Sequence, residues 1–352
     1  MVEAQAPPLL TVSAIPTILV PTVPTILAGT ARVPLLCLGT QNARSLPIIN
    51  FFCTTSSITM EQFDPGILLN RFPKDTYVSP FFVPGLFTRT FPSLSFYARI
   101  FLGTTHWLTA RAAKGLCDDA AWCYASAWIL EDVERTGIRV HVTGLDHFNA
   151  VKGPCVIVAN HMSTLETYLL PCMLRPRFPV TFIVKRSLVE MPFFGAVMRS
   201  RDPVVVDRKN PREDLATILR EGCDRLSRGI SVIVFPQSTR TLHIDPKHFN
   251  TIGVKLARKA NVPVVPLALK TDAWGAGRKI KELGKIRPDN DVIFRFFPPV
   301  TVEGSGHAEH KAILEAISST LHYWEWRQKE KDEGRQVPPL LDPDFTLPTI
   351  ER

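Results

Sequence analysis

The sequence predicts an α/β protein in which a mostly parallel central sheet is covered by helices on both faces and is preceded by an N-terminal helical hairpin. From residue 137 onward, short apolar runs rich in Val and Ile alternate with segments of helical length. Strands that are buried on both faces and joined by crossover helices produce this alternation. With 45% hydrophobic and 21% charged residues, the chain has enough apolar material for a large core.

The expected elements follow one another at regular intervals. Strands are predicted at residues 138–142, 155–159, 180–184, 204–206, 231–235, 264–269 and 292–296. Helices are predicted at residues 165–174, 187–199, 211–228, 246–260 and 310–326. Short apolar runs bounded by Gly, Pro or Asn indicate the strands, whereas longer segments with apolar residues three and four apart indicate the helices.

Composition divides the chain into four regions. Residues 1–75 are expected to form a disordered or loosely structured leader, residues 76–135 a helical hairpin rich in Phe and Trp, residues 136–332 the α/β domain, and residues 333–352 a Pro-rich tail. Within the leader, residues 9–29 carry no charge and could cross a bilayer by length, but three prolines interrupt any helix there. A disordered leader, a loosely membrane-associated segment and a targeting sequence all stay open.

The predicted hairpin has helices at residues 95–113 and 118–135, separated by Lys114 and Gly115. Both helices carry aromatic residues, and Phe and Trp with flanking arginines suit the headgroup boundary of a bilayer. Two interpretations are open for this pair. One is plain packing onto the α/β domain, and the other is an anchor at the membrane interface.

The net charge indicates the class of binding partner, and the cysteines indicate the redox compartment. The formal net charge is +8, and because residues 1–75 contain four basic and four acidic residues, the excess lies downstream. A basic domain suits an anionic partner, such as a phosphate-bearing substrate or an anionic membrane surface. Nucleic acid is not expected, because there is no zinc-finger spacing, RNP-type motif or long Lys/Arg run. Seven cysteines without a C-x-x-C pair favour a reducing compartment.

The stretch PCVIVANHMSTLE, residues 154–166, carries the clearest catalytic pattern. A buried strand ends at Asn160 and His161, and Ser163 to Glu166 has the Ser-x-x-Glu pattern of a helix start. The histidine is therefore expected just beyond a strand tip, where open α/β sheets bind ligands. A carboxylate in the first helical turn can orient an imidazole that removes a proton from a hydroxyl. Taken alone, Glu166 is better explained as a capping residue, and His161 is as readily structural as catalytic.

Basic residues follow other predicted strands. The sequence FPQSTR after residues 231–234 presents Arg240 beside two hydroxyl side chains, and Arg208 and Lys270 follow two further strands. An arginine on a loop beyond a strand end, amid hydroxyl and backbone NH groups, is suited to bind phosphate. At any one position a surface arginine paired with an acid would explain the residue equally well. Their repeated placement at strand exits favours a shared anion site.

The segments NHMSTLE, DPVVVDR, FPQSTR and VPVVPLAL resemble, in order and spacing, the four sequence blocks of the glycerolipid acyltransferases, the 1-acylglycerol-3-phosphate acyltransferase family. The family patterns are H-x4-D, a block ending in Arg, F-P-E-G-T-R and a proline-centred apolar block. The resemblance covers roughly residues 137–299, close to half the chain, and implies that residues 136–332 form the acyltransferase domain.

The resemblance also implies roles for individual residues. His161 would be the base that deprotonates the acceptor hydroxyl, with Glu166 in the place of the family aspartate. The substrate-binding residues would be Arg208, Gln237, Ser238, Thr239 and Arg240, with Lys185 adding positive charge near the phosphate. Residues 262–266 would match the fourth block, which is connected with the acyl-donor side or with packing.

Three positions depart from the family pattern. Glu166 is one methylene longer than Asp, Gln237 lacks the charge of Glu, and Ser238 replaces a Gly whose backbone could adopt positive φ. These departures leave the identity of the acceptor open, and they leave room for an inactive homologue.

The expected function is therefore transfer of a fatty acyl group from acyl-CoA or acyl carrier protein to a hydroxyl of a lysophosphatidate-like glycerol phosphate acceptor in phospholipid synthesis, at the cytoplasmic face of a membrane. The acyl carrier would be a co-substrate. No cofactor or metal is expected, because no cluster with metal-ligand spacing accompanies His161. The alternative is a catalytically silent lipid-binding protein at the membrane surface.

Overall fold

The structure is a computed structural model that describes residues 71–72 and 75–340, except residues 193 and 238. The predicted leader up to residue 70 and the end of the predicted Pro-rich tail, from residue 341, lie outside the described residues.

The described part of the chain contains one eight-stranded sheet in the order β1-β2-β8-β7-β3-β6-β4-β5. The strands are β1 (Tyr77–Val78), β2 (Val140–Thr143), β3 (Val156–Ala159), β4 (Val180–Lys185), β5 (Val204–Val206), β6 (Ser231–Val234), β7 (Val264–Lys270) and β8 (Val292–Phe296). Five of the seven neighbouring pairs are parallel, and the pairs β1–β2 and β7–β8 are antiparallel. The mostly parallel sheet is confirmed, and the predicted strands are found to within two residues at their ends.

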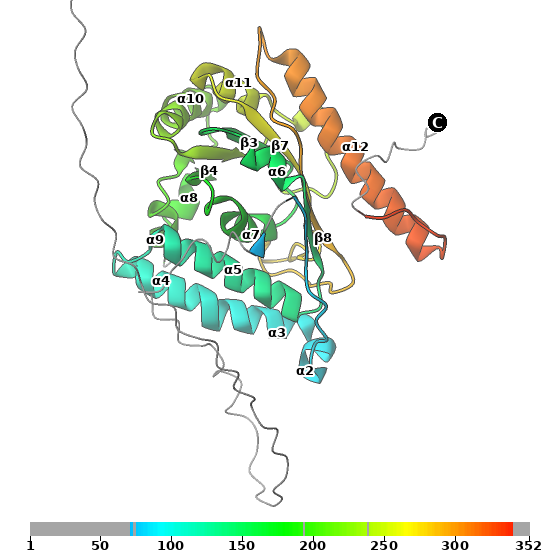
Figure 1. Cartoon of the computed structure of the whole chain (residues 1–352). Coiled ribbons are helices and arrows are strands. Elements are labelled where there is room, and N and C mark those ends of the chain that lie inside the picture. The colour runs from blue at the N-terminus through cyan, green and yellow to red at the C-terminus, as the bar shows by residue number, and fades with distance from the viewer. Residues whose placement is uncertain (1–70, 73–74, 193, 238, 341–352) are drawn as a thin grey trace, which may run out of the picture. The chain divides into compact units, whose positions relative to one another are not determined.

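Helices cover both faces of this sheet (Figure 1). On one face lie α10 (Pro211–Ser227) and α11 (Ile252–Ala260), and on the other lie α5 (Asp119–Arg135) and α7 (Leu165–Leu174). The long helix α12 (His307–Asp332) begins beside α11, where the ring of Phe249 contacts His310. The short helix α6 (Leu145–Asn149) follows β2 and packs near β8.

The N-terminal hairpin is confirmed. Its first arm follows α2 (Leu86–Thr90) and consists of α3 (Pro92–Ala98), the π-helical turn η2 (Arg99–Thr105) and α4 (His106–Ala113), and its second arm is α5. The turn between the arms uses Gly115 at a φ of 70°, a conformation that glycine adopts without steric cost. Asp118 then caps α5 by accepting a hydrogen bond from the backbone nitrogen of Ala121 at 2.7 Å.

Two predicted helices prove to be pairs of shorter elements. Residues 187–199 form α8 (Arg186–Val189) and α9 (Phe194–Arg199), because Pro192 disfavours a helical conformation at Met191 and has no NH to continue the helix. Residues 246–260 form the 3-10 turn η3 (Pro246–His248) and then α11. The side chain of Asn250 accepts a hydrogen bond from Ile252 N at 3.0 Å, so it starts a new helix instead of continuing the old one.

The loops after β3, β6 and β7 lie together at the carboxyl ends of these strands. The three strands are neighbours and run parallel, so their carboxyl ends lie on the same side of the sheet. Helix α11 lies close on this part of the sheet, because a Cβ atom on Gly253 would come within 2.4 Å of Val158 on β3. The tight packing fixes the strands whose ends carry the predicted site.

Candidate functional site

His161 lies in the loop between β3 and α7, and its Nδ1 atom is 2.8 Å from Oε1 of Glu166 in the first turn of α7. The imidazole is partly exposed, at 15%, whereas the Glu166 side chain is fully buried. With Nδ1 held by the carboxylate, Nε2 is the ring nitrogen that can exchange a proton with a substrate. The predicted pairing of these two residues is present in the structure.

The carboxylate of Glu166 also caps the start of α7. It accepts hydrogen bonds from Met162 N at 2.7 Å, from Ser163 N at 2.9 Å and from the Ser163 hydroxyl at 2.9 Å. Thr271 adds a hydroxyl donor at 2.6 Å. Capping and orienting the histidine had been alternatives on sequence grounds, and the geometry combines them in one carboxylate.

These donors decide the charge state of Glu166. Burial alone would raise the pKa of the carboxyl group, but the hydrogen bond and the charge of His161, with the hydrogen bond of Thr271, hold the pKa below its ordinary value. The carboxylate is therefore ionised at neutral pH although it is buried.

Asn160 fixes where β3 ends. Its side chain donates to Leu269 O at 2.8 Å and accepts from Leu269 N at 2.9 Å, so it continues the ladder towards β7 with a side chain in place of a backbone pair. Because β3 and β7 are neighbours, this contact brings the end of β7 to the histidine loop. Thr271 reaches Glu166 in this way.

The loop after β6 is fastened to the backbone of His161. Thr241 N donates to His161 O at 3.0 Å, and His161 N donates to Oε1 of Gln237 at 2.6 Å. Nε2 of Gln237 donates in turn to the hydroxyl of Thr241 at 2.5 Å. Gln237 is only 5% exposed. The Gln237 side chain thus supports the histidine loop by accepting a hydrogen bond from the His161 backbone.

An aromatic ring supports the imidazole from the same loop. Phe235 stacks on His161 with ring centroids 4.4 Å apart and an interplanar angle of 18°. Stacking on Phe235 restricts the plane of the imidazole, and the contact with Glu166 restricts its rotation within that plane. Together they allow the ring only a narrow range of orientations.

The predicted phosphate ligands are only partly gathered. Arg240 lies on the loop after β6, next to the histidine loop, and its Nη2 atom is 3.2 Å from Oε1 of Glu282. Thr239 is exposed, and Ser238 lies outside the described residues. Arg240 is thus the predicted phosphate ligand that follows β6, the strand adjacent to β3.

Arg208 and Lys185 lie further along the sheet edge. Lys185 ends β4 and Arg208 follows β5, which are the second and third strands from β3. At the usual spacing between strands, these positions are roughly 10 and 14 Å from the end of β3. Arg208 has a φ of 59°, which a non-glycine residue adopts seldom. Arg240 is on the loop after β6, so Lys185 on β4 and Arg208 after β5 lie at the first and second strands from the strand that precedes it.

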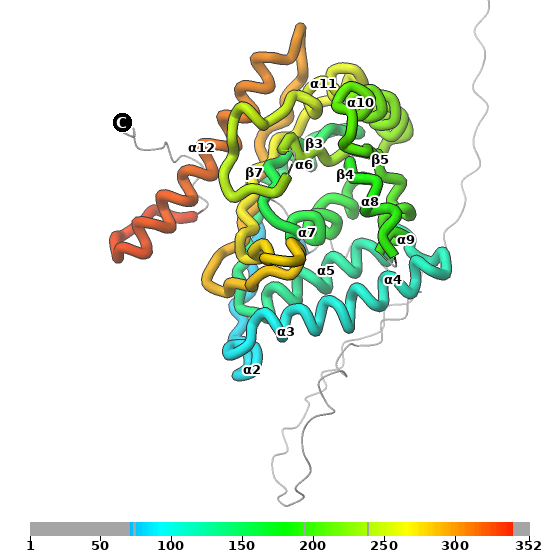
Figure 2. Tube along the Cα trace, turned by 180° about the vertical axis from the view of Figure 1, so that it is seen from behind, coloured from blue at the N-terminus to red at the C-terminus, as the bar shows by residue number. Residues whose placement is uncertain are grey.

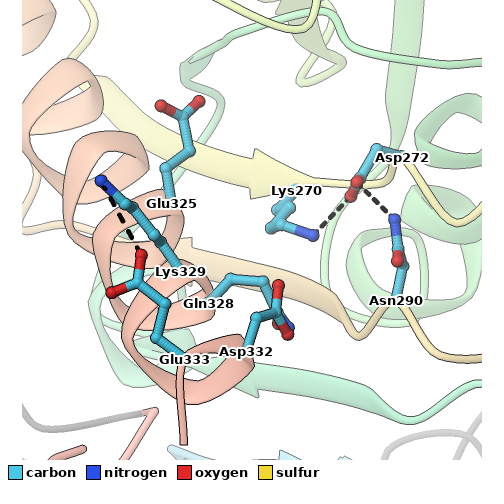
Figure 3. A pocket seen from close by; sticks show the side chains of 8 residues that line it. All are labelled: Lys270, Asp272, Asn290, Glu325, Gln328, Lys329, Asp332 and Glu333. Carbon is cyan, nitrogen blue, oxygen red and sulfur yellow. Dashed lines mark hydrogen bonds and ion pairs between the residues drawn. The ribbon is translucent and has the colours of Figure 1, made fainter. Parts of the chain in front are cut away.

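Lys270, the third basic residue that follows a predicted strand, faces a cavity beside α12 instead of the histidine loop. Its ammonium group pairs with Asp272 at 2.6 Å, and Asp272 accepts a hydrogen bond from Asn290 (Figure 3). The three residues line a polar cavity of about 410 Å³ together with residues near the C-terminal end of α12: Glu325, Gln328, Lys329, Asp332 and Glu333. None of the predicted site residues lines this cavity, so Lys270 does not contribute to a shared anion site.

Sequence reasoning missed three residues of the site: Thr271, Thr241 and Glu282. Thr271 had a usable signal, since it directly follows a strand predicted to lie in the same parallel sheet as the histidine strand. Glu282 had no such signal, because it lies in a long connection between β7 and β8, 42 residues from its partner Arg240. Among the described residues, no group of three His, Cys, Asp or Glu side chains is arranged to hold a metal ion.

Comparisons with known proteins indicate the family of the chain. The sequence profile of the family described as Acyltransferase matches residues 139–270, which include both loops of the site. The 1-acyl-sn-glycerol-3-phosphate acyltransferase of Pseudomonas aeruginosa is 31% identical over 185 residues, which are 53% of this chain and 67% of that protein. The enzyme of the same name from Saccharomyces cerevisiae is 31% identical over 170 residues, 47% of this chain and 53% of that protein.

A solved structure also aligns with this chain. It is the 1-acyl-sn-glycerophosphate acyltransferase from Thermotoga maritima, with 20% identity and a TM-score of 0.46 over 71% of this chain and 98% of that one. The chain spans two thirds of the Pseudomonas relative and about half of the yeast relative. From the sequence matches, the chain belongs to the acyltransferase family of enzymes that includes the 1-acyl-sn-glycerol-3-phosphate acyltransferases.

Proposed function

We propose that this enzyme transfers a fatty acyl group from a thioester donor, acyl-CoA or acyl carrier protein, to a free hydroxyl of a lysophosphatidate-like acceptor. The observation that carries the proposal is the His161–Glu166 pair at the carboxyl end of the sheet, with Nδ1 of the imidazole 2.8 Å from a buried carboxylate. The relatives from Pseudomonas and yeast are named for this acyl transfer, which supports the choice of acceptor.

The reaction proceeds by direct attack. Nε2 of His161 takes the proton of the acceptor hydroxyl as the oxygen forms a bond to the thioester carbonyl carbon. The carbon–sulfur bond then breaks, the departing thiolate takes the proton from the imidazolium, and the products are an ester and a free thiol. Glu166 fixes the proton on Nδ1 and stabilises the transient imidazolium, because its carboxylate is ionised and faces that nitrogen.

Ser163 and the buried cysteines Cys155 and Cys172 give little support to a covalent acyl-enzyme. The Ser163 hydroxyl donates to Glu166 and accepts from Leu165 N at 3.0 Å, so it is engaged in starting α7. Burial raises the pKa of the Cys155 thiol to about 11 and that of Cys172 to about 11, which disfavours the nucleophilic thiolate at neutral pH. The proposed route uses neither a metal nor an organic cofactor.

Arg240 would hold the acceptor phosphate. Its side chain is 28% exposed and lies on the loop that is hydrogen-bonded to the His161 backbone, so an anion bound there would lie beside the loop that carries the imidazole. A guanidinium offers parallel NH donors that match the oxygens of a phosphate. Binding of the non-reacting phosphate would thus position the hydroxyl for attack.

Residues 81–94, which lead into the first arm of the hairpin, would meet the membrane surface. None of the helices in the described part of the chain has the length and apolar character needed to cross a bilayer. The aromatic residues Trp122 and Tyr124 of α5 are buried in the domain, so the second arm packs as a core helix. Large apolar side chains are instead exposed on and before α2 and α3: Phe81, Phe82, Val83, Leu86, Phe87, Phe91 and Leu94.

This exposed face fits the boundary between headgroups and acyl chains, where Phe and Leu contact lipid and nearby basic residues contact anionic headgroups. A double substitution, Leu86→Glu with Leu94→Glu, tests it by flotation with vesicles of phosphatidylcholine and phosphatidylglycerol. Loss of vesicle binding with an unchanged melting temperature supports the surface, whereas unchanged flotation refutes it. Deleting residues 76–135 would be uninformative, because α5 supplies part of the core.

The catalytic proposal is tested with the purified full chain, labelled oleoyl-CoA or oleoyl acyl carrier protein, and a panel of lysolipids, with the products identified by mass spectrometry. We expect His161→Ala to lower kcat on the order of 10²-fold or more, the usual scale for loss of a general base. His243→Ala is the matched control, since this histidine is largely exposed. Unchanged turnover in His161→Ala refutes the mechanism. Absence of transfer by the wild-type protein, with lysolipid binding retained, favours the silent lipid-binding alternative.

A further inference from the structure

The connection between β7 and β8 reaches the proposed phosphate site from outside the four family blocks. We call residues 273–288 the strap. The strap contains five basic residues, Arg278, Lys279, Lys281, Lys285 and Arg287, and a single acid, Glu282. That acid is the residue whose carboxylate lies 3.2 Å from the Arg240 guanidinium. Within the strap, Glu282 is thus the only acid, and its carboxylate faces the proposed phosphate ligand; the other acids of the β7–β8 connection, Asp272, Asp289 and Asp291, lie outside the strap.

The backbone of Glu282 is held by contacts that do not involve Arg240. The indole of Trp274, which is 3% exposed, donates to Glu282 O at 2.9 Å, and the hydroxyl of Tyr97 on α3 donates to Gly284 O at 2.6 Å. Trp274 also stacks on Tyr168 of α7 with ring centroids 5.7 Å apart. Figure 2 shows the strap beside α3. The carboxylate can therefore leave Arg240 by side-chain rotation, without movement of the strap.

The ion pair itself is weak enough to be exchanged. The Arg240 side chain is 28% exposed and that of Glu282 is 50% exposed, and one N–O contact joins them. Pairs with this exposure change an equilibrium constant by at most about fivefold, because water and salt screen them. A phosphate can take two parallel NH donors of the same guanidinium and forms the stronger contact. An arriving phosphate would therefore displace the carboxylate.

Building on the proposed role of Arg240, we propose that Glu282 is an internal competitor for the acceptor phosphate. In the free enzyme the Glu282 carboxylate is paired with the Arg240 guanidinium. When the phosphate binds, the carboxylate leaves the guanidinium but stays nearby, where its negative charge repels the phosphate. Both effects weaken binding of the acceptor and equally of the product, because acylation of the hydroxyl leaves the phosphate unchanged. Glu282 thus sets the affinity for phosphate-bearing lipids and promotes product release, without contact with the reacting hydroxyl.

Binding without turnover gives the first test. The full chain carrying His161→Ala is titrated with a short-chain lysophosphatidate by calorimetry, alone and with Glu282→Gln, Arg240→Gln or both. We expect Glu282→Gln to lower Kd about three- to fivefold, Arg240→Gln to raise Kd, and Glu282→Gln to have a smaller effect once Arg240 is replaced, because only the repulsion between the carboxylate and the phosphate is then relieved. Asp289→Asn, which removes an equal charge just beyond the strap, is the control and should leave Kd unchanged.

Kinetics of the chain with His161 intact give the second test. Glu282→Gln should lower KM for lysophosphatidate three- to fivefold and strengthen inhibition by the phosphatidate product by a similar factor. KM for the acyl donor, and the rate with a monoacylglycerol that has no phosphate, should not change. An unchanged or higher Kd in Glu282→Gln, or an equal decrease in Asp289→Asn, overturns the inference alone. If Arg240→Gln leaves phosphate binding intact, the proposed role of Arg240 is refuted as well.

Discussion

Oε1 of Glu166 lies 2.8 Å from Nδ1 of His161 and 2.7 Å from the backbone nitrogen of Met162, so one carboxylate oxygen joins the imidazole to the start of α7. The contacts that start the helix and those that orient the imidazole are therefore made by a single carboxylate. Substitution of Glu166 should affect both, but to different degrees depending on what the new side chain retains.

Glu166→Gln removes the charge and keeps an oxygen that can accept the capping hydrogen bonds. We expect kcat to fall on the order of 10²-fold, because an amide does not stabilise the imidazolium. The melting temperature should also fall, because an amide nitrogen replaces the oxygen that accepts from the Ser163 and Thr271 hydroxyls. Glu166→Asp keeps the charge and should recover part of the lost rate. The measurements are kcat with acyl-CoA and lysophosphatidate, and thermal unfolding of each variant. Near-normal kcat in Glu166→Gln would assign this residue a structural role only.

Acid should destabilise the wild-type protein more than the Glu166→Gln variant. The pKa of Glu166 is lower in the folded protein than its ordinary value of 4.5, so the folded state binds fewer protons than the unfolded state near that pH. The resulting stabilisation is fully present above the ordinary pKa and is lost as the pH falls through the lower folded pKa. Thermal unfolding of both proteins between neutral pH and about pH 3 measures the difference. Parallel pH profiles would contradict the prediction.

Thr271→Val removes the hydroxyl that donates to Glu166 at 2.6 Å and contacts Ser163 at 2.9 Å. A buried carboxylate left with one donor fewer should cost about 1–3 kcal/mol of unfolding free energy and should also lower kcat. Thr320→Val is the matched control, since this buried threonine donates within α12, in a different part of the fold. We expect the control to lose stability and retain kcat in denaturation and turnover assays. Equal kcat in both variants would show that Thr271 does not act through the site.

Gln237→Glu introduces the family residue at the position that accepts from His161 N at 2.6 Å. A second carboxylate beside His161 favours the imidazolium over the neutral base, so the acid limb of the pH–rate profile should move to higher pH. The variant also loses the amide donor to Thr241, which should lower the melting temperature. Gln328→Glu on α12 is the control. A pH–rate profile that coincides with that of the wild type would show that position 237 acts only on the backbone.

How far the sequence predicted the fold depended on the range of the interactions. The mostly parallel sheet, seven of its eight strands and helix α7 follow from apolar periodicity within short windows, and the structure has them where the pattern indicates. The short antiparallel strand β1 was not predicted. The split of residues 187–199 at Pro192 had a local signal that the helical pattern masked. The start of α11 also had a local signal, since the Asn250 side chain accepts from Ile252 N, but the same side chain donates to Pro236 O in a different loop, which no local pattern indicates.

By itself, the sequence placed His161 beyond a strand tip and Glu166 in the next helical turn, since their order and spacing in the chain fix both. Only the tertiary structure decided what completes the site. Thr271 donates to Glu166 across 105 residues, Glu282 reaches Arg240 across 42, and Lys270 turns away to pair with Asp272. The physical reason is that strand order and side-chain direction bring these groups together, and neither leaves a periodic pattern in the chain.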